Sequence, residues 1–353
     1  MFLAFKEIVY SRGRYRMVVP VVFLITYMVF FLSSLSVGLA RLNRLALDQW
    51  GAQSVVLSEY ANKNLSASII KEEEFGPHLQ GDSVAAMGQM AVVANREDGT
   101  EKINAQVFGL AWNSFLAPKL SEGRSADNAY EIIVDKRLQQ KGVKMGDQLQ
   151  LNGSERLYQV VGFTEDNSFF TQPVIFMALD DFRELKYGSS LVKNISALVV
   201  KNDQKIEEAG LSQLSMGELI ENIPGYQAQV LTFSFMIGAM VLITFLVLGI
   251  FMYIITIQKT HLYGIMRAQG IASRKIIASI FWQIFILSTL GISLAVLALL
   301  ATQLALPASV PFYSDWRAYG GLIALIVLMS LAGGLLSIRR VLKIDPITAI
   351  GGE

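Results

Sequence analysis

Four long apolar windows that hold no charged residue most constrain what this chain can fold into. Each has about 20 residues or more, the length that an α-helix needs to cross the hydrocarbon core of a bilayer. The whole chain is 53% hydrophobic with a mean hydropathy of +0.44, and 17% of its residues are charged, against about a quarter in soluble proteins. The windows predict four transmembrane helices, at residues 17–40, 231–257, 276–304 and 318–338. The first is too long for the apolar core of a cleaved signal peptide, so we expect it to remain as an anchor.

Lys and Arg gather in the short segments that flank these windows, and their placement predicts the sidedness of the protein. An amphipathic N-terminal segment at 1–16, the loop at 258–275 and the tail at 339–353 are all basic. With four spans they lie on one side of the membrane. Residues 41–230 instead hold 18 Lys and Arg against 25 Asp and Glu, a net charge of −7. We therefore expect a multi-pass protein of the cell (plasma) membrane with both termini cytoplasmic, and with residues 41–230 and a short loop at 305–317 extracellular. The basic flanking residues are Lys6, Arg12, Arg14, Arg16, Lys259, Arg267, Arg274, Lys275, Arg339, Arg340 and Lys343.

The segment 41–230 is long enough for a domain with its own core, and its pattern indicates an α+β fold. Asn152-Gly153 predicts a hairpin, because both central positions of a type I′ turn need positive φ. Short β-branched or aromatic runs between turn residues predict strands at Ser54–Ser58, Met90–Ala94, Ala105–Leu110, Glu131–Val134, Gln148–Leu151, Tyr158–Phe163, Val174–Met177 and Ala197–Val200. Helices are expected at Lys136–Lys141, Leu179–Leu185 and Gln204–Asn222.

Several classes of function are excluded by what the sequence lacks. It has no GxxxxGK[ST] loop, no HExxH helix and no GxSxG elbow, so neither P-loop ATP hydrolysis nor the common hydrolase chemistries are expected. It has no Cys and only two His, on opposite predicted sides, so we expect no metal site. The net charge of +1 argues against nucleic-acid binding. Uncharged spans argue against an ion-coupled transporter. In span four, Gly320-Gly321 and Gly333-Gly334 suit close helix packing.

The cytoplasmic loop at 258–275 allows two interpretations of equal weight. Its basic residues could hold a turn at the lipid headgroups. Alternatively, Leu262, Ile265 and Met266 form the apolar side of a short amphipathic helix that ends at Gly270, a C-cap residue type. Such a helix could be offered to a cytosolic partner.

This loop resembles the coupling segment of FtsX-like and MacB-like ABC transporter permeases, in which Gly-Ile/Leu-x-x-Ala-x-Gly-x-Ser follows span two. The matching residues here run from Gly264 to Ser273. Three further stretches are similar to the family: the tail 344–350, the run Gly146–Leu151, and Tyr158–Phe163. The order of one span, a large external domain and three spans is also the family's.

The resemblance implies an α-helical membrane permease with an extracellular α+β domain that dimerises and pairs with two copies of a cytosolic ABC ATPase. ATP would be bound by that partner, and the permease itself would be no enzyme and carry no intrinsic cofactor. Family members work by mechanotransmission, which implies contact with lipid but no polar channel. The residues implied in ATPase coupling are His261, Tyr263, Gly264, Met266, Arg267 and Gly270.

Within the family, the N-terminal stretches Leu3–Ile8, Arg14–Arg16 and Gly38–Arg41 with Asn43 are similar to those of haem efflux permeases. Haem as cargo would want carboxylate, phenolate or thioether ligands for its iron and basic partners for its propionates. The candidates near the outer boundary are Glu59, Tyr60, Tyr226, Met236, Met240, Arg41 and Arg44. Two alternatives stay open on the same scaffold: a regulator of a cell-wall hydrolase, and an exporter of a lipoprotein or an antimicrobial peptide.

Overall fold

The computed structural model describes residues 2–10, 12–15, 17–79, 82–96, 102–307 and 310–342. The chain divides into two compact units. One, called here the helical unit, comprises the chain up to Gly38 and from Val230 onward, and the other, the sheet domain, comprises Leu39–Gln229. The family-like tail at 344–350, Arg16 and Lys343 lie outside the described residues.

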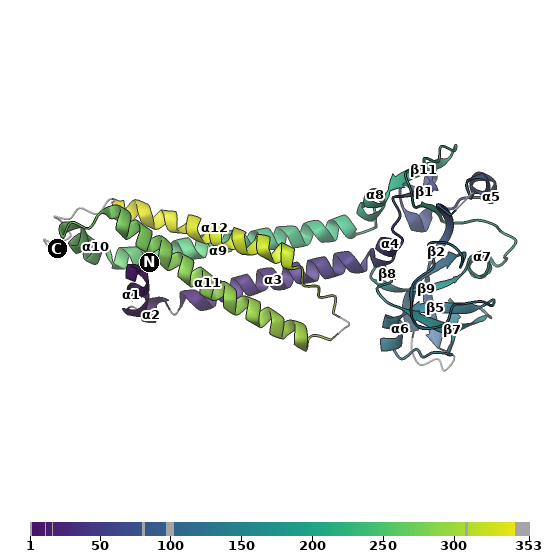
Figure 1. Cartoon of the computed structure of the whole chain (residues 1–353), viewed down its shortest axis with the longest axis horizontal. Coiled ribbons are helices and arrows are strands. Elements are labelled where there is room, and N and C mark those ends of the chain that lie inside the picture. Colours follow the sequence, from purple (N-terminus) through teal and green to yellow (C-terminus); the bar gives the residue numbers. More distant parts are fainter. Residues whose placement is uncertain are drawn as a thin grey trace. The chain divides into compact units, whose positions relative to one another are not determined.

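Long helices occupy all four apolar windows, and each is long and apolar enough to cross a membrane. Where the sequence predicts spans at 17–40, 231–257, 276–304 and 318–338, the structure has helices that begin and end a few residues away (Figure 1). The long helices are α3 (Val18–Leu42), α9 (Tyr226–Gln258), α11 (Ser273–Ala305) and α12 (Trp316–Leu342). The short ones in this unit are α1 (Phe2–Tyr10), α2 (Arg12–Tyr15) and α10 (Thr260–Ala268).

Close packing in the helical unit depends on glycines at the helix contacts. A Cβ added at Gly333 would lie 2.6 Å from the carbonyl oxygen of Phe245 and 3.0 Å from the nitrogen of Gly249, so α12 meets the backbone of α9 directly. The prediction for Gly333-Gly334 is therefore confirmed. For Gly320-Gly321 it is wrong within one copy of the chain, since no described heavy atom lies within 4 Å of a Cβ at either position.

This contrast predicts opposite effects of one substitution in one helix. Gly333→Ala should destabilise the chain by about 1 to 3 kcal/mol, because the added methyl meets backbone that cannot move aside. The matched Gly321→Ala should be neutral or gain up to about 1 kcal/mol from helix propensity. Thermal unfolding of the two full-length variants in detergent measures both effects. Equal shifts in the two variants would contradict the packing described above.

The sheet domain is built on one mixed sheet, with strand order β11-β1-β10-β2-β3-β9-β5-β7-β4. Pairs β3–β9 and β5–β7 are parallel and the other pairs on this path are antiparallel. β6 pairs with β2 and β7, and β8 pairs with β9. The strands are β1 (Ser54–Ser58), β2 (Val84–Arg96), β3 (Lys102–Leu110), β4 (Leu120–Gly123), β5 (Glu131–Asp135), β6 (Gln148–Leu151), β7 (Leu157–Thr164), β8 (Ser168–Phe169), β9 (Gln172–Ala178), β10 (Ala197–Val200) and β11 (Leu211–Ser215).

Short helices cover and connect this sheet. Phe182 of α7 sits directly over Gly88 and Gly109, where a Cβ would lie 2.1 Å and 2.3 Å from it, so these two glycines let α7 rest on β2 and β3. The α-helices of the domain are α4 (Leu45–Gln49), α5 (Glu72–Phe75), α6 (Lys136–Gln140), α7 (Leu179–Tyr187) and α8 (Met216–Glu221). Three 3-10 turns lie at Glu59–Ala61, Leu65–Ala67 and Gly76–His78.

The strand predictions are confirmed at all eight ranges, and so is the hairpin turn. Asn152 and Gly153 have φ of +51° and +70°, and the Ser154 amide donates to the Leu151 carbonyl at 2.9 Å. The predicted helix at Gln204–Asn222 is wrong for most of its length. Its centre is strand β11, which pairs with β1, and α8 starts only after Ser215. There Ser215 and Glu218 form a capping box, a local signal for a helix start that fixes the boundary.

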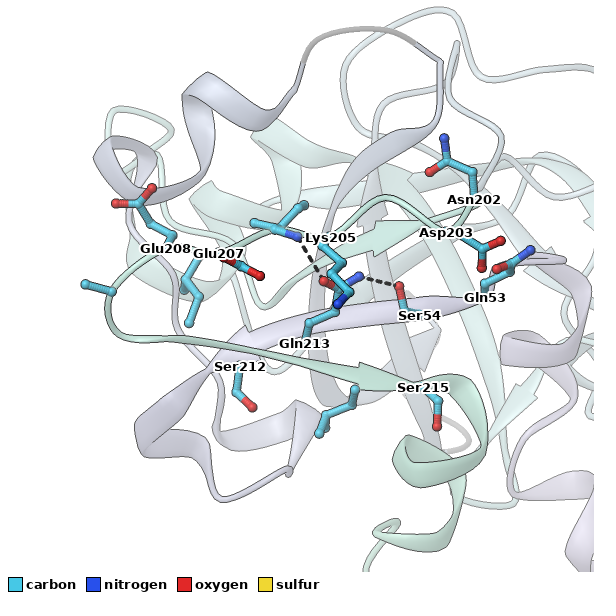
Figure 2. A pocket seen from close by; sticks show the side chains of 14 residues that line it. Gln53, Ser54, Asn202, Asp203, Lys205, Glu207, Glu208, Ser212, Gln213 and Ser215 are labelled. Atoms are coloured by element: carbon cyan, nitrogen blue, oxygen red, sulfur yellow. Dashed lines mark hydrogen bonds between the residues drawn. The ribbon is translucent and has the colours of Figure 1, made fainter.

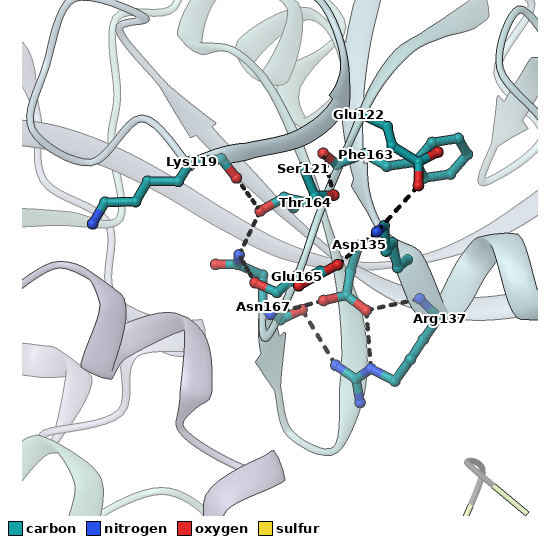
Figure 3. Close-up of polar contacts among 10 residues, drawn as sticks. Lys119, Ser121, Glu122, Asp135, Arg137, Phe163, Thr164, Glu165 and Asn167 are labelled. Carbon is teal, nitrogen blue, oxygen red and sulfur yellow. Dashed lines mark hydrogen bonds and ion pairs between the residues drawn. The ribbon is translucent and has the colours of Figure 1, made fainter.

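A polar cluster joins the ends of β5, β7 and β8 (Figure 3). The buried Asp135 carboxylate accepts from the Asn167 amide at 2.7 Å and from the backbone nitrogen and Nε of Arg137, each at 3.0 Å. Asn167 Nδ2 in turn donates to Thr164 Oγ1 at 2.8 Å. Because every member has a partner, this cluster serves to hold the sheet rather than to await a ligand.

Glu131, at the start of β5, is a second buried carboxylate with a full set of donors. It accepts from both terminal nitrogens of Arg124, from the backbone amides of Asp127 and Asn128 at 2.9 and 3.2 Å, and from Asn128 Nδ2 at 3.0 Å. The hydrogen bonds from Arg124 are the largest cause that holds the pKa of Glu131 well below its usual range. A depressed pKa means that these bonds stabilise the fold above the ordinary value near 4.5 and are lost as the pH falls below it.

Glu131→Gln should therefore lower the free energy of unfolding by about 1 to 3 kcal/mol at neutral pH, through loss of charge-assisted hydrogen bonds. The difference from the unaltered chain should shrink as the pH falls below 4.5, since the Glu131 carboxylate of the unfolded chain takes up a proton there while that of the folded chain stays ionised. Denaturant unfolding of the full chain at several pH values measures this. Glu155→Gln, at an exposed loop position, is the control. A gap that does not depend on pH would refute the assignment.

Candidate functional site

The loop between the second and third spans folds into a helix with a defined end. After α10, the Gly270 amide donates to the Arg267 carbonyl and the Ile271 amide donates to the Met266 carbonyl, both at 3.0 Å. Gly270 has a φ of +85°, which glycine adopts without strain. These two bonds form a Schellman motif, and Ile271 packs in the same cluster as Met266, the apolar contact that accompanies it. The predicted C-cap role of Gly270 is confirmed.

One face of α10 is buried in the helical unit and the other is not. Of the residues implied in ATPase coupling, Tyr263, Gly264 and Met266 are buried, and burial raises the pKa of the Tyr263 phenol. His261 and Gly270 are exposed, and Arg267 is half-buried. The buried cluster around α10 comprises Tyr15, Val18, Val22, Leu248, Met252, Ile255, Tyr263, Met266, Ile276, Ile280, Ile284 and Leu287. The buried face of α10 therefore shares one apolar cluster with residues of α2, α3, α9 and α11, and its other side is exposed.

A closed ring of polar side chains lies at the start of α10. Lys259 Nζ donates to the Tyr15 hydroxyl at 3.0 Å and lies 3.5 Å from Glu7 Oε2. The Tyr15 hydroxyl donates to Gln283 Oε1 at 2.6 Å, and Gln283 Nε2 donates to Glu7 and, at 3.2 Å, to Ser279 Oγ. All five residues are buried. Sequence reasoning missed this ring. The available signals were that Glu7 is the one acid among the basic residues of segment 1–16 and that Gln283 is an amide inside a predicted span.

The end of α3 and the start of α9 are fastened together in the sheet domain. Asn43, just after α3, is buried, and its Nδ2 donates to Gln229 Oε1 of α9 at 3.2 Å. The carbonyls of Leu42 and Asn43 accept from the amides of Thr171 and Phe170, both at 3.3 Å. Phe170 and Thr171 form the turn between β8 and β9 and have φ of +51° and +62°. The end of α3 is thus bonded both to the β8–β9 turn of the sheet and to the start of α9.

Arg41 and Arg44, predicted as partners of haem propionates, lie beside this anchor in the sequence. Arg44 Nε is 3.4 Å from Asp48 Oδ2, and both side chains are partly exposed. Burial raises the pKa of Asp48, and the two arginines oppose that shift. Asp48 therefore already offsets part of the positive charge of Arg44 that a haem propionate would pair with.

The predicted iron ligands are not all brought together. Tyr226, the first residue of α9, packs against the domain core that contains Trp50 and Ile223. Glu59 and Tyr60 lie on another element, the 3-10 turn directly after β1, and Tyr60 is 91% exposed.

Met236 and Met240 lie one turn apart on α9. Met236 is 42% exposed, whereas Met240 is half-buried against a cluster that includes Val29 and Ile292. Tyr226 lies ten residues before Met236, or about 15 Å along the helix axis. One helix thus carries a phenol and two thioethers, and the two thioethers differ in their exposure.

Two hollows in the sheet domain contain none of these predicted residues. The larger, of about 840 Å³, is open and polar and lies along the edge strand β11 (Figure 2). There the Gln213 side chain binds Ser54 Oγ at 2.7 Å, the Gln204 carbonyl at 2.8 Å and the Ile206 amide at 2.9 Å, so it holds its own loop in place. The smaller, of about 300 Å³, lies beside Trp50 and Lys119. Among the described residues no group of three or more His, Asp or Glu could hold a metal.

Relatives match this chain along its whole length. A protein of Staphylococcus haemolyticus named hemin transport system permease protein HrtB is 28% identical over 355 residues, which covers 100% of this chain and 99% of that one. A protein of Staphylococcus epidermidis with the same name is 27% identical over 358 residues, with the same coverage. An uncharacterized ABC transporter permease of Mycobacterium tuberculosis is 22% identical over 358 residues, again with 100% and 99% covered.

Among solved structures, the extracellular domain of the ABC-type transporter YknZ from Gram-positive bacteria is 14% identical. The match covers 43% of this chain and 84% of that one, with a TM-score of 0.32, too low to bear on the fold.

Two family models match in succession. The FtsX-like permease C-terminal model matches residues 234–346. The MacB-like periplasmic core domain model matches residues 18–210, more than half of the chain. The chain therefore belongs to the family of FtsX-like and MacB-like ABC transporter permeases.

Proposed function

We propose that this chain is the permease subunit of an ABC-type efflux transporter that works by mechanotransmission and exports haem from the membrane. The proposed mechanotransmission is supported by the way in which α10 packs in the helical unit. Its buried face packs on a core that α3 and α9 share, so a force on its exposed face is delivered to the base of both helices.

Two unbroken helices are suited to relay that force. α3 runs without interruption from Val18 to Leu42, and α9 from Tyr226 to Gln258. Each leads into the sheet domain, where the bond between Asn43 and Gln229 fastens the two chain segments to each other. A displacement of α3 then reaches the sheet at the turn Phe170-Thr171, and a displacement of α9 reaches it also through α8 and β11, which precede α9 in the chain.

The proposal includes the arrangement expected from the sequence. The termini and α10 lie in the cytoplasm of a cell-membrane protein, the sheet domain lies outside, and the chain pairs with a second copy of itself and with two copies of a cytosolic ABC ATPase. ATP is bound and hydrolysed by that ATPase, and the chain holds no intrinsic cofactor. The basic residues Lys259, Arg267, Arg274 and Lys275 around α10 support the sidedness.

Arg267→Glu should weaken binding of the ATPase about tenfold or more, because it reverses the charge at the end of α10 where the exposed face would meet the partner. Co-purification and a titration of the ATPase against the permease in lipid nanodiscs measure this. Arg317→Glu, an exposed position at the start of α12, is the matched control on the opposite predicted side. Undiminished binding with Arg267→Glu, in a variant whose thermal stability is intact, would remove α10 from the interface.

Haem as cargo is supported by the relatives named as hemin transport permeases and by side chains that can ligate its iron. Thioether and phenolate groups are haem ligands, and Met236, Met240 and Tyr226 supply both on one helix. Arg41 and Arg44 could pair with propionates. Glu59 and Tyr60, in the 3-10 turn after β1, complete the proposed set.

Met236→Leu should raise the dissociation constant for hemin about tenfold or more if this thioether is a ligand. Deletion of the gene should sensitise cells to hemin, and the Met236→Leu variant should restore resistance poorly. Met145→Leu is the control, since Met145 is 43% exposed against 42% for Met236 and lies in the sheet domain. Hemin absorption titrations and growth at graded hemin measure the two effects.

The outcome of the deletion separates the cargo from the permease itself. Unchanged hemin sensitivity in the deletion strain would defeat haem export and leave the two alternatives, regulation of a cell-wall hydrolase and export of a lipoprotein or an antimicrobial peptide. Co-purification of the ATPase tests the permease assignment independently of any cargo.

A further inference from the structure

We infer that the ring of Glu7, Tyr15, Lys259 and Gln283 is a lock that joins the N-terminal helix α1 to the start of α10, so that both helices move as one body. This inference rests on the proposed function, in which an ATPase acts on α10. Glu7 and Lys259 are positioning residues in it. They are nearly inaccessible, at 8% and 5% exposed, and so reach no partner themselves.

The ring takes one residue from each of four segments. Glu7 lies in α1, Tyr15 in α2, Lys259 at the corner between α9 and α10, and Gln283 in α11. Lys259 also lies 5.1 Å from the centre of the Tyr15 ring, over its face. Gln283 accepts from Tyr15 and donates to Glu7, so its amide fixes the relative position of the phenol and the carboxylate. Moving any one segment away from the others would break at least two of these contacts.

Lys259 controls the direction in which α10 leaves α9. It is the residue before α10 and has no side-chain cap, and its carbonyl accepts the first helical bond, from the Tyr263 amide at 3.0 Å. The ring holds Lys259, and the Schellman motif at Gly270 holds the other end of α10. α10 is thereby fixed at both ends, and α1 is fixed to it through Glu7.

Stability alone is a poor reason for a buried ion pair at this place. Taking the carboxylate and the ammonium out of water costs desolvation free energy that their mutual attraction only partly regains, so replacing both charges with apolar groups of similar volume is often neutral for stability. An apolar pair cannot fix the orientation of α1 relative to α10. Dispersion contacts persist when two side chains slide past each other, whereas hydrogen bonds depend on direction. The lock therefore predicts a variant that is stable but no longer rigid between α1 and α10.

The experiment measures the separation of α1 and α10 directly in the full-length permease. Because the chain has no Cys, Tyr10→Cys on α1 and Leu262→Cys on α10 can be spin-labelled without other changes; the two positions are 94% and 46% exposed. Pulsed dipolar spectroscopy in nanodiscs gives the distance distribution for the permease alone. A second measurement is made with the co-purifying ATPase trapped by ATP and vanadate.

We expect one narrow distance that is the same in both states. Lys259→Met and the double variant Glu7→Leu with Lys259→Met should each broaden the distribution at least twofold, and the double variant should keep its thermal unfolding midpoint. Lys6→Gln, a charge removal at an exposed position next to Glu7, is the control and should leave the width unchanged.

Two results would overturn the lock: a distance that shifts on trapping in the unaltered ring, or an unchanged width in the double variant. Failure of the proposed function looks different. If no ATPase binds, the widths in the permease alone still decide whether the ring holds α1 to α10.

Discussion

The intolerance of a bilayer for charge and for unpaired backbone groups is the constraint on which the rest of this structure depends. Helices satisfy their own backbone, so α3, α9, α11 and α12 can be made of uncharged residues throughout their apolar windows. Charged side chains are then confined to the helix ends. Lys259 lies at such an end, just after α9, and forms a buried ion pair with Glu7 of α1 that Tyr15 and Gln283 solvate in place of water.

The same constraint makes close packing the means by which the helices hold together. Lipid tails are as apolar as leucine, so burial of apolar surface gives little preference for one helix arrangement. Contacts between backbones do give a preference, and Gly333 and Gly291 provide them on α12 and α11. The proposed mechanotransmission requires a rigid helical unit, because slack between α10 and the bases of α3 and α9 would absorb the displacement.

The sheet domain answers a different requirement, which is to receive two helical segments of the chain at one place. Three hydrogen bonds supply that place, one from the Asn43 side chain to Gln229 and two from the β8–β9 turn to the end of α3, and none of them involves a charge. Asp135 and Glu131, by contrast, sit in complete donor sets elsewhere in the domain and keep the sheet rigid.

Patterns of period and composition made the helices and most strands predictable from the sequence. The β-branched residues between turn residues predict a strand at Ser54–Ser58, and the tolerance of glycine for positive φ predicts a helix end at Gly270. The strand at Leu211–Ser215 was not predictable in this way. Its residues favour no secondary structure strongly, and its pairing with β1, which lies more than 150 residues earlier, decides the matter.

The sequence by itself determined the four apolar helices, their basic flanks and the α+β character of the segment between the first two, because these follow from local periodicity and from charge. Only the tertiary structure decided which side chains meet. It buried Tyr263, Gly264 and Met266 inside the chain, left Tyr60 exposed, and closed the ring of Glu7, Tyr15, Lys259 and Gln283. The physical reason is that a buried polar contact joins Glu7 and Gln283, which are 276 positions apart, and no local pattern records such a partner.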